Sequence, residues 1–212
     1  MERTLDFAQR GIALMLRTGE GQEITERFKS EGASAYYLGL ILFWLATSIL
    51  FTPLPVFFQQ NLALTPTIVF AVYVVNTVGG CAGYLLARNR TQTEISREKQ
   101  TVTRIALVRG SLALLMTAAA VYASMLSSLL AVTALVLMGF AYAVFLISTL
   151  SISMEVLPQG QAGLFNVLVS AGGAVGCLIG PLIANNYGFL YVFLTSGAVF
   201  ILSHLAFRIF AR

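Results

Sequence analysis

Charged residues are scarce in this chain of 212 residues: Lys, Arg, Asp and Glu together make up only 10% of it. A typical soluble domain is about a quarter charged. Hydrophobic residues make up 58% of the chain, and the mean hydropathy is +0.82. So few charged side chains do not cover the surface of a soluble domain of this size, so the composition predicts an integral membrane protein.

Residues that carry metal and acid–base chemistry are also rare. The chain has one histidine, His204, one aspartate, Asp6, and two cysteines, Cys81 and Cys177, whose spacing fits neither a metal site nor a redox pair. A zinc protease motif needs two histidines, and the acid-dependent membrane enzymes need carboxylates inside their spans. We therefore expect no catalytic residues, no cofactor and no bound metal, and we expect His204 to serve in packing or at the membrane interface.

Six apolar stretches are each long enough to cross a bilayer, which takes about 20 residues. The stretch from Ser111 to Met154 carries no charge and is too long for one span, so the chain must turn back between Ser124 and Ser128. The sequence predicts an all-α membrane bundle of six transmembrane helices, at residues 36–58, 66–87, 105–124, 128–152, 163–184 and 188–209.

The basic residues predict the orientation of these spans. Except for Arg109, every Lys and Arg lies in the first 35 residues, between the second and third spans, or at the C-terminal end, which six spans place on one side. The positive-inside rule makes that side cytoplasmic, together with both termini. Because these residues flank apolar spans and form no patch on a polar domain, the net charge of +4 predicts no nucleic-acid partner. They are Arg3, Arg10, Arg17, Arg27, Lys29, Arg88, Arg90, Arg97, Lys99, Arg104, Arg208 and Arg212.

Residues 1–35 are the only sizeable polar segment and are too short for a domain. Apolar residues from Leu5 to Leu16 follow helical spacing, and Gly19 and Gly21 then break the pattern. This spacing favours a helix in the membrane interface, followed by a charged link. The predicted organisation is a cytoplasmic segment at 1–35 and one transmembrane domain at 36–212.

Three short motifs lie on this topology. Glu155, Pro158 and Gly163 connect the fourth and fifth spans, where a charged helix end and a turn are the simplest interpretation. Glycines recur every four residues in the fifth span, before Pro181, and form a strip that favours close helix packing. Gly83 precedes two arginines where the second span enters the basic loop. The strip consists of Gly172, Gly176 and Gly180, and the two arginines are Arg88 and Arg90.

Together these motifs resemble the C-terminal half of a major facilitator superfamily transporter, in which two six-helix halves surround a central site. The residues from Glu155 to Gly163 resemble the segment between the tenth and eleventh helices of that family. Gly83, Arg88 and Arg90 resemble the family's motif between its second and third helices, although Ala87 stands where that motif has an acidic residue. Ala162 stands where the sugar-porter branch has an arginine. The resemblance implies a small-molecule substrate, the cell membrane, and an inter-half loop at residues 1–35.

Polar and aromatic residues within the spans are candidates for substrate binding. The resemblance implies that the first, second, fourth and fifth spans line the cavity, whereas the third and sixth lie outside it. Hydrogen bonding between helices is the alternative role for each candidate. The candidates are Trp44, Thr47, Ser48, Tyr73, Asn76, Tyr142, Phe145, Asn166 and Ser170, with Phe70 as a further aromatic wall, and a cytoplasmic charge motif of Arg88, Arg90 and Glu155.

Acidic residues are missing from the interior of every predicted span. A proton-coupled transporter normally carries its proton on an embedded acid, so an acid of that kind must lie outside this chain if protons drive transport. Arg109 lies near the predicted entry of the third span, where its long side chain is expected to reach the interface.

Two kinds of function fit these features. The first is transport of a small organic solute by alternating access, with this chain as one half that is either a fragment or pairs with a second chain, including a second copy. The other is a six-helix membrane module that binds a ligand for another machine, or a remnant without transport of its own. A binding module would hold its solute tightly by itself, whereas an isolated transporter half would bind weakly.

We predict that Glu155 lies near Arg88 or Arg90, at the cytoplasmic ends of the fourth and second spans. An exposed ion pair of this kind contributes about 1 kcal/mol or less to stability. The distance between the carboxylate and the guanidinium groups in an experimental structure tests this prediction. A separation too large for a bridging water would contradict it.

Overall fold

The computed structural model describes residues 31–88, 95–122, 125–156 and 162–211, and all regular structure in these ranges is helical. Six helical segments in this part of the chain are long and apolar enough to cross a membrane. The helices are α3 (Glu31–Phe51), α4 (Leu54–Gln60), α5 (Pro66–Arg88), α6 (Ile95–Val121), α7 (Met125–Val156), α8 (Ala162–Tyr187) and α9 (Phe189–Phe210).

Two of these segments differ from their predicted form. The first is divided, because Pro53 has no backbone N–H to continue α3 and instead starts the short helix α4, accepting hydrogen bonds from Val56 and Phe57 at 3.1 Å. The third begins at Ile95, ten residues before the predicted start at 105. Lys, Arg and Gln favour helix, so the charged approach to this span is helical as well.

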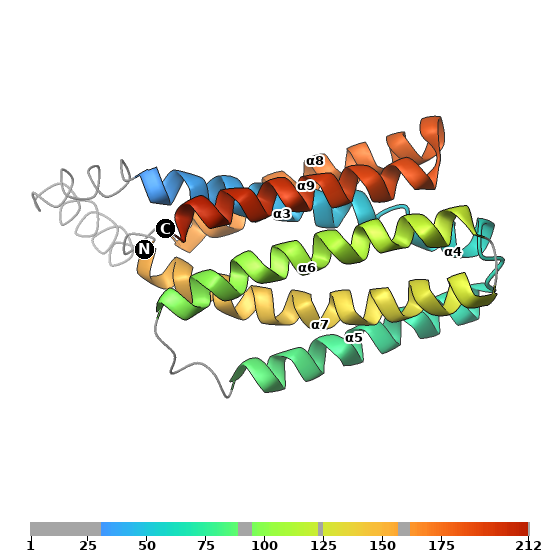
Figure 1. The fold of residues 1–212 in the computed structure, drawn as a ribbon, viewed down its shortest axis with the longest axis horizontal. Helices are drawn as coiled ribbons and strands as arrows, with labels where there is room; N and C mark the ends of the chain where they lie inside the picture. Colours follow the sequence, from blue (N-terminus) through green and yellow to red (C-terminus); the bar gives the residue numbers. More distant parts are fainter. Residues whose placement is uncertain (1–30, 89–94, 123–124, 157–161, 212) are drawn as a thin grey trace, which may run out of the picture.

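The bundle consists of two groups of three helices (Figure 1). In one group α3 packs against both α8 and α9, and in the other α7 packs against both α5 and α6. The groups are joined by α6 and α9, which pack along each other, and by aromatic contacts between α3 and α7. The start of α3 and the end of α9 lie at the same end of the bundle, as an even number of spans requires.

The glycine strip of α8 faces α3. A Cβ added at Gly176 would lie 2.5 Å from the carbonyl oxygen of Leu45, and one at Gly180 would lie 2.6 Å from that of Ile49. A Cβ at Gly172 would collide with the carbonyl of Ile41. These three glycines therefore let the two backbones touch, which gives the pair its van der Waals contact in an apolar solvent.

Glycines make a second close pair of α5 and α7. A Cβ at Gly79 would lie 2.9 Å from the carbonyl oxygen of Val136, and one at Gly83 would lie 2.7 Å from that of Phe140. From the other side, Gly139 of α7 meets the backbone oxygen of Asn76, which would be 2.5 Å from an added Cβ. The same device thus fixes α8 to α3 and α5 to α7, one pair in each group.

Aromatic rings and hydroxyl groups join the remaining helices. The rings of Phe43 on α3 and Phe145 on α7 are stacked with centroids 3.5 Å apart. Ser196 and Ser203 of α9 donate hydrogen bonds of 2.9 Å to backbone carbonyls of α3, at Ala46 and Gly39. Tyr36 near the start of α3 donates to the carbonyl of Thr149 on α7 at 2.8 Å. Such bonds between helices replace the water that the membrane interior lacks.

Replacement of Gly176 by Ala is expected to lower the free energy of unfolding by about 1–3 kcal/mol, because the new methyl group collides with the α3 backbone. Gly173→Ala is the matched control on the same helix, since its Cβ would meet only the hydroxyl of Ser48 at an ordinary 3.6 Å. The control should be neutral or stabilising by up to about 1 kcal/mol. Thermal unfolding in detergent measures both, and equal effects of the two substitutions would contradict the packing described.

Candidate functional site

An aromatic pair lies at the contact between α3 and α7. The rings of Trp44 and Tyr142 meet edge to face, with centroids 5.6 Å apart and planes at 88°. Both side chains are partly buried, yet the Trp44 Nε1 atom is buried and has no hydrogen-bond partner among the described residues. An indole N–H without an acceptor in a buried position can be satisfied by a ligand or by water.

Arg109 lies within the third span, which runs from Arg97 to Val121, five residues after Arg104. Its side chain is 0% exposed and is the largest fully buried side chain described. The expectation that Arg109 reaches the membrane interface is therefore wrong, because its side chain is enclosed by rings from neighbouring helices.

Four aromatic rings surround the guanidinium group of Arg109. Its Cζ atom lies 5.0 Å from the ring centre of Phe43, 5.1 Å from Phe200, and 5.6 Å from both Phe51 and Tyr142. A desolvated cation gains about 2 kcal/mol from such a ring. The rings accept no conventional hydrogen bond, however, and Nε, Nη1 and Nη2 have no partner among the described residues.

Without an acceptor for its hydrogen bonds, the buried Arg109 side chain lowers the stability of the fold. A charge at the centre of a bilayer costs about 3 kcal/mol on insertion scales, which the aromatic rings can offset. Each buried donor left unpaired costs a further 1–3 kcal/mol, roughly, and the rings do not remove that cost. Arg109 can thus donate several hydrogen bonds, and no described neighbour accepts them.

The two polar candidates on α5, Tyr73 and Asn76, are partly buried. The hydroxyl of Tyr73 and the Oδ1 atom of Asn76 are buried without a hydrogen-bond partner among the described residues. Asn76 is held beside Gly139, which leaves room for its side chain at the helix contact. Phe70, one turn before Tyr73, is 70% exposed and so lies on the outer surface of this bundle.

Of the candidates on α3 and α8, Ser48 lies at the contact between the two helices. Ser48 lies beside Gly173 and Gly176, and Thr47 donates 2.8 Å to the carbonyl of Phe43 in its own helix. Asn166 and Ser170 of α8 are exposed. The structure therefore brings Trp44 and Tyr142 together and leaves Asn166 and Ser170 exposed on α8.

Two sequence candidates serve in packing. Phe145 is fully buried between Phe43 and Phe207, where it joins three helices and offers no open wall to a solute. His204 lies 2.8 Å from the carbonyl oxygen of Thr103 through Nδ1, which must carry the proton because a carbonyl only accepts. His204 thus joins α9 to α6, in agreement with the packing role expected for it.

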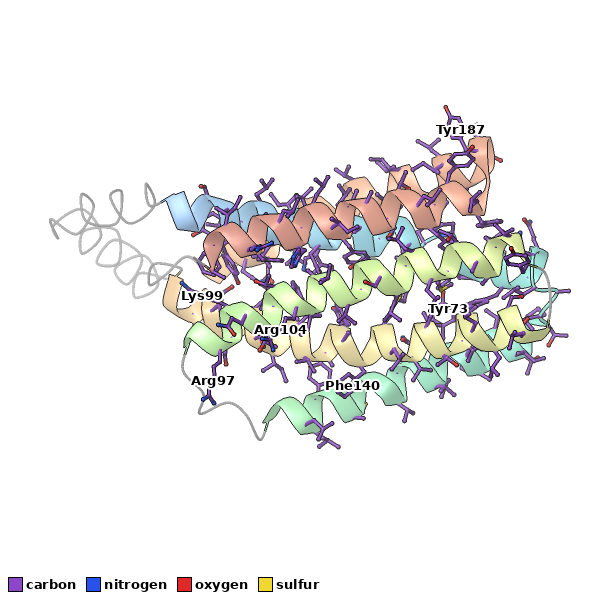
Figure 2. The ribbon with its side chains drawn as sticks, viewed as in Figure 1. Tyr73, Arg97, Lys99, Arg104, Phe140 and Tyr187 are labelled. Carbon is purple, nitrogen blue, oxygen red and sulfur yellow. The ribbon has the colours of Figure 1, made fainter. Side chains whose placement is uncertain are left out.

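The predicted contact of Glu155 with Arg88 or Arg90 lies outside the described side chains. Arg90 lies outside the described residues, and so do the side chains of Arg88 and Glu155 and the segment containing Pro158. The described part of the same end is basic. Figure 2 shows Arg97, Lys99 and Arg104 at the start of α6, at the opposite end of the bundle from Tyr187. Lys99 also contacts the ring of Phe210 at 4.3 Å, which ties the end of α9 to this basic region.

A pocket of about 410 Å³ opens between α5, α6 and α7. Arg104 and Phe140, both labelled in Figure 2, contribute to its wall together with apolar residues such as Leu86, Val108 and Leu137. None of the predicted substrate-binding residues lines this pocket. Its apolar wall suits a lipid chain at least as well as a solute, so we do not place the functional site there.

Six membrane-length apolar helices with a buried polar and aromatic centre define this protein as a polytopic integral membrane protein. A family model described as Major Facilitator Superfamily matches residues 12–181, which is well over half of the chain. The chain belongs to this superfamily, whose members are membrane transporters of small solutes and typically not enzymes. No curated protein and no solved structure matches the chain significantly.

Sequence reasoning missed Arg109 as a member of the central site. The signal was available, because Arg109 is the one basic residue outside the segments that the predicted topology places on one side of the membrane. Gly79 and Gly139 were also missed. With Gly83, Gly79 forms a small-xxx-small pair that predicts a close helix contact, whereas the partner helix and Gly139 emerge only from the tertiary structure.

Arg109→Met is expected to raise the free energy of unfolding by about 1–3 kcal/mol, because it removes a buried charge whose donors lack acceptors. Arg104→Met is the control on the same helix, where the side chain is exposed and a change below about 0.5 kcal/mol is expected. Chemical or thermal unfolding in the same detergent gives both values. A loss of stability in Arg109→Met would show instead that the arginine supports the fold.

Proposed function

We propose that this chain is the C-terminal six-helix half of a facilitator-type transporter, which moves a small organic solute across the cell membrane by alternating access. Membership of the superfamily supports solute transport. The observation that carries the rest is the low burial of α5 and α8. In an apolar 18-residue window of each of these spans only 17% of the residues are buried, against 33–44% in the other four spans. A second bundle packed on α5 and α8 would give them the burial that one half does not supply.

The polar residues of α8 support the same conclusion. Asn166 and Ser170 are exposed within the span Gly163–Tyr187, four residues apart and so on the same face of the helix. Polar side chains in a span are usually turned toward protein or a water-filled cavity instead of lipid. This face of α8 therefore fits the boundary between two halves around an aqueous path.

Trp44 and Tyr142 are the centre of the proposed solute site, since they are the candidates that the fold brings into contact. Tyr73 and Asn76 of α5, and Ser48 and Thr47 of α3, are proposed as further polar groups of this site. Residues 1–35 are proposed as the loop that joins the halves. The second wall is either an N-terminal half or a second copy of the chain in parallel orientation.

The basic end of the bundle is proposed to be cytoplasmic, with both termini on that side. In a variant with Cys81 and Cys177 replaced by Ala, we expect Gln60→Cys to react with a membrane-impermeant maleimide on intact cells. Gln100→Cys should react only after permeabilisation. Both positions are exposed, at opposite ends of the bundle. Labelling of Gln100→Cys on intact cells, with Gln60→Cys protected, would reverse the orientation.

Solute flux and affinity separate the transporter from a binding module. We expect vesicles that contain both bundles to exchange a labelled small solute, and the purified monomeric chain to bind that solute only weakly, because half of the cavity wall is missing. Counterflow in vesicles and isothermal titration measure the two properties. Submicromolar binding by the monomer would favour a ligand-binding module, and absence of flux with the second bundle present would favour a non-transporting remnant.

A further inference from the structure

Among the described residues, no acidic side chain pairs with the positive charge of Arg109. The sequence contains no Asp or Glu from residue 99 to residue 154 or from 32 to 93. Glu98, on the same helix, is 11 residues away, which is about 16 Å along the axis. The cation is nevertheless held in a defined place by rings from α3, α7 and α9.

The ring of neighbours around the guanidinium is not equally closed on all sides. Phe43 and Phe200 are completely buried, whereas Phe51 and Tyr142 are partly exposed. Of these four rings, Phe51 and Tyr142 are therefore the ones past which we expect a small molecule to reach Arg109. Tyr142 also contacts Trp44, so one ring connects the buried cation to the proposed solute site.

The polar groups of this cluster define the chemistry of a ligand. Arg109 and the Trp44 indole can only donate hydrogen bonds, and the Tyr142 hydroxyl can donate one as well. Nε, Nη1 and Nη2 of Arg109 and Nε1 of Trp44 are buried donors without described partners. A carboxylate accepts several hydrogen bonds and pairs with the planar guanidinium through two parallel ones. One fixed positive charge balances one carboxylate, whereas a phosphate dianion would leave an excess charge.

We propose that Arg109, with Tyr142 and Trp44, binds the carboxylate of a small organic monoanion, and that such anions are the solutes of this protein. That these anions are carried across the membrane rests on the proposed transport function, whereas their binding at Arg109 does not. Phe43, Phe51 and Phe200 then enclose the apolar part next to the carboxylate, which suits a short aliphatic or aromatic acid. Binding requires displacement of the Tyr142 or Phe51 side chain. Because Trp44 contacts Tyr142, we expect the fluorescence of Trp44 to change on binding.

The test uses the intrinsic fluorescence of Trp44, the only tryptophan in the chain. The full chain in lipid nanodiscs is titrated with butyrate and, separately, with butyramide, a neutral molecule of the same shape. We expect butyrate to change the emission saturably in the millimolar range, with a dissociation constant of about 1–10 mM. Butyramide should bind at least tenfold more weakly, because it brings no charge to the guanidinium. Equal effects of the two molecules would overturn the proposal. So would the absence of a saturable effect of butyrate at concentrations up to about 100 times the expected dissociation constant.

Variants locate the effect at Arg109. Arg109→Gln is expected to weaken butyrate binding about 100-fold, and Arg109→Lys about tenfold, since lysine keeps the charge but not the planar pair of donors. Arg104→Gln, an exposed position one turn and a residue earlier, is the control and should stay within about twofold of the unchanged chain. Helical circular dichroism and gel filtration check that each variant is folded. If a variant does not fold, the butyrate and butyramide comparison in the unchanged chain still decides.

Flux measurements keep this proposal separate from the proposed function. Butyrate binding that depends on Arg109, without flux of any solute when both bundles are present, would support the anion site and contradict transport. Flux of a neutral solute that is unaffected by Arg109→Gln would support transport and contradict the anion site. Flux of carboxylates that is lost in Arg109→Gln and retained in Arg104→Gln supports both.

Discussion

Within a bilayer, apolar side chains gain little by leaving lipid for one another, so the helices of this bundle depend on close backbone contact and hydrogen bonds between helices. Glycines provide that contact twice, where Gly172, Gly176 and Gly180 of α8 touch α3 and where Gly79 and Gly83 of α5 touch α7. Hydroxyl groups of α9 add direct bonds to the α3 backbone. These contacts fix α8 and α9 against α3, and α5 against α7.

The central site shows the cost of placing polar chemistry inside such a bundle. Arg109 is stabilised as a cation by four rings, but its donors have no acceptor among the described residues. A fold selected for stability alone would place a methionine or leucine there. The arrangement is understandable if the missing acceptor belongs to a molecule that the protein binds, because the same unpaired donors that reduce stability then supply affinity and selectivity for an anion.

Some residues of the candidate site could be interpreted from the sequence and others could not, for physical reasons. Trp44 and Tyr142 were chosen as candidates because polar and aromatic groups in the middle of a span are conspicuous, and the structure brings their rings into contact. Phe145 carries the same signal yet packs in the core, since periodicity does not distinguish a buried ring from a cavity wall. Arg109 was placed at the membrane interface because it lies only four residues into the predicted third span, and its burial among rings of other helices emerged only from the tertiary structure.

The sequence by itself determined the membrane class, the six spans and the distribution of basic residues, because these depend on local apolar length and on charge along the chain. The glycine strip of α8 was equally a local pattern. The tertiary structure alone decided that α3 is the partner of this strip, that rings from three helices meet around Arg109, and that α5 and α8 stay the least buried. These features depend on which helices pack together, and contacts between residues far apart in the chain leave no local pattern in one sequence.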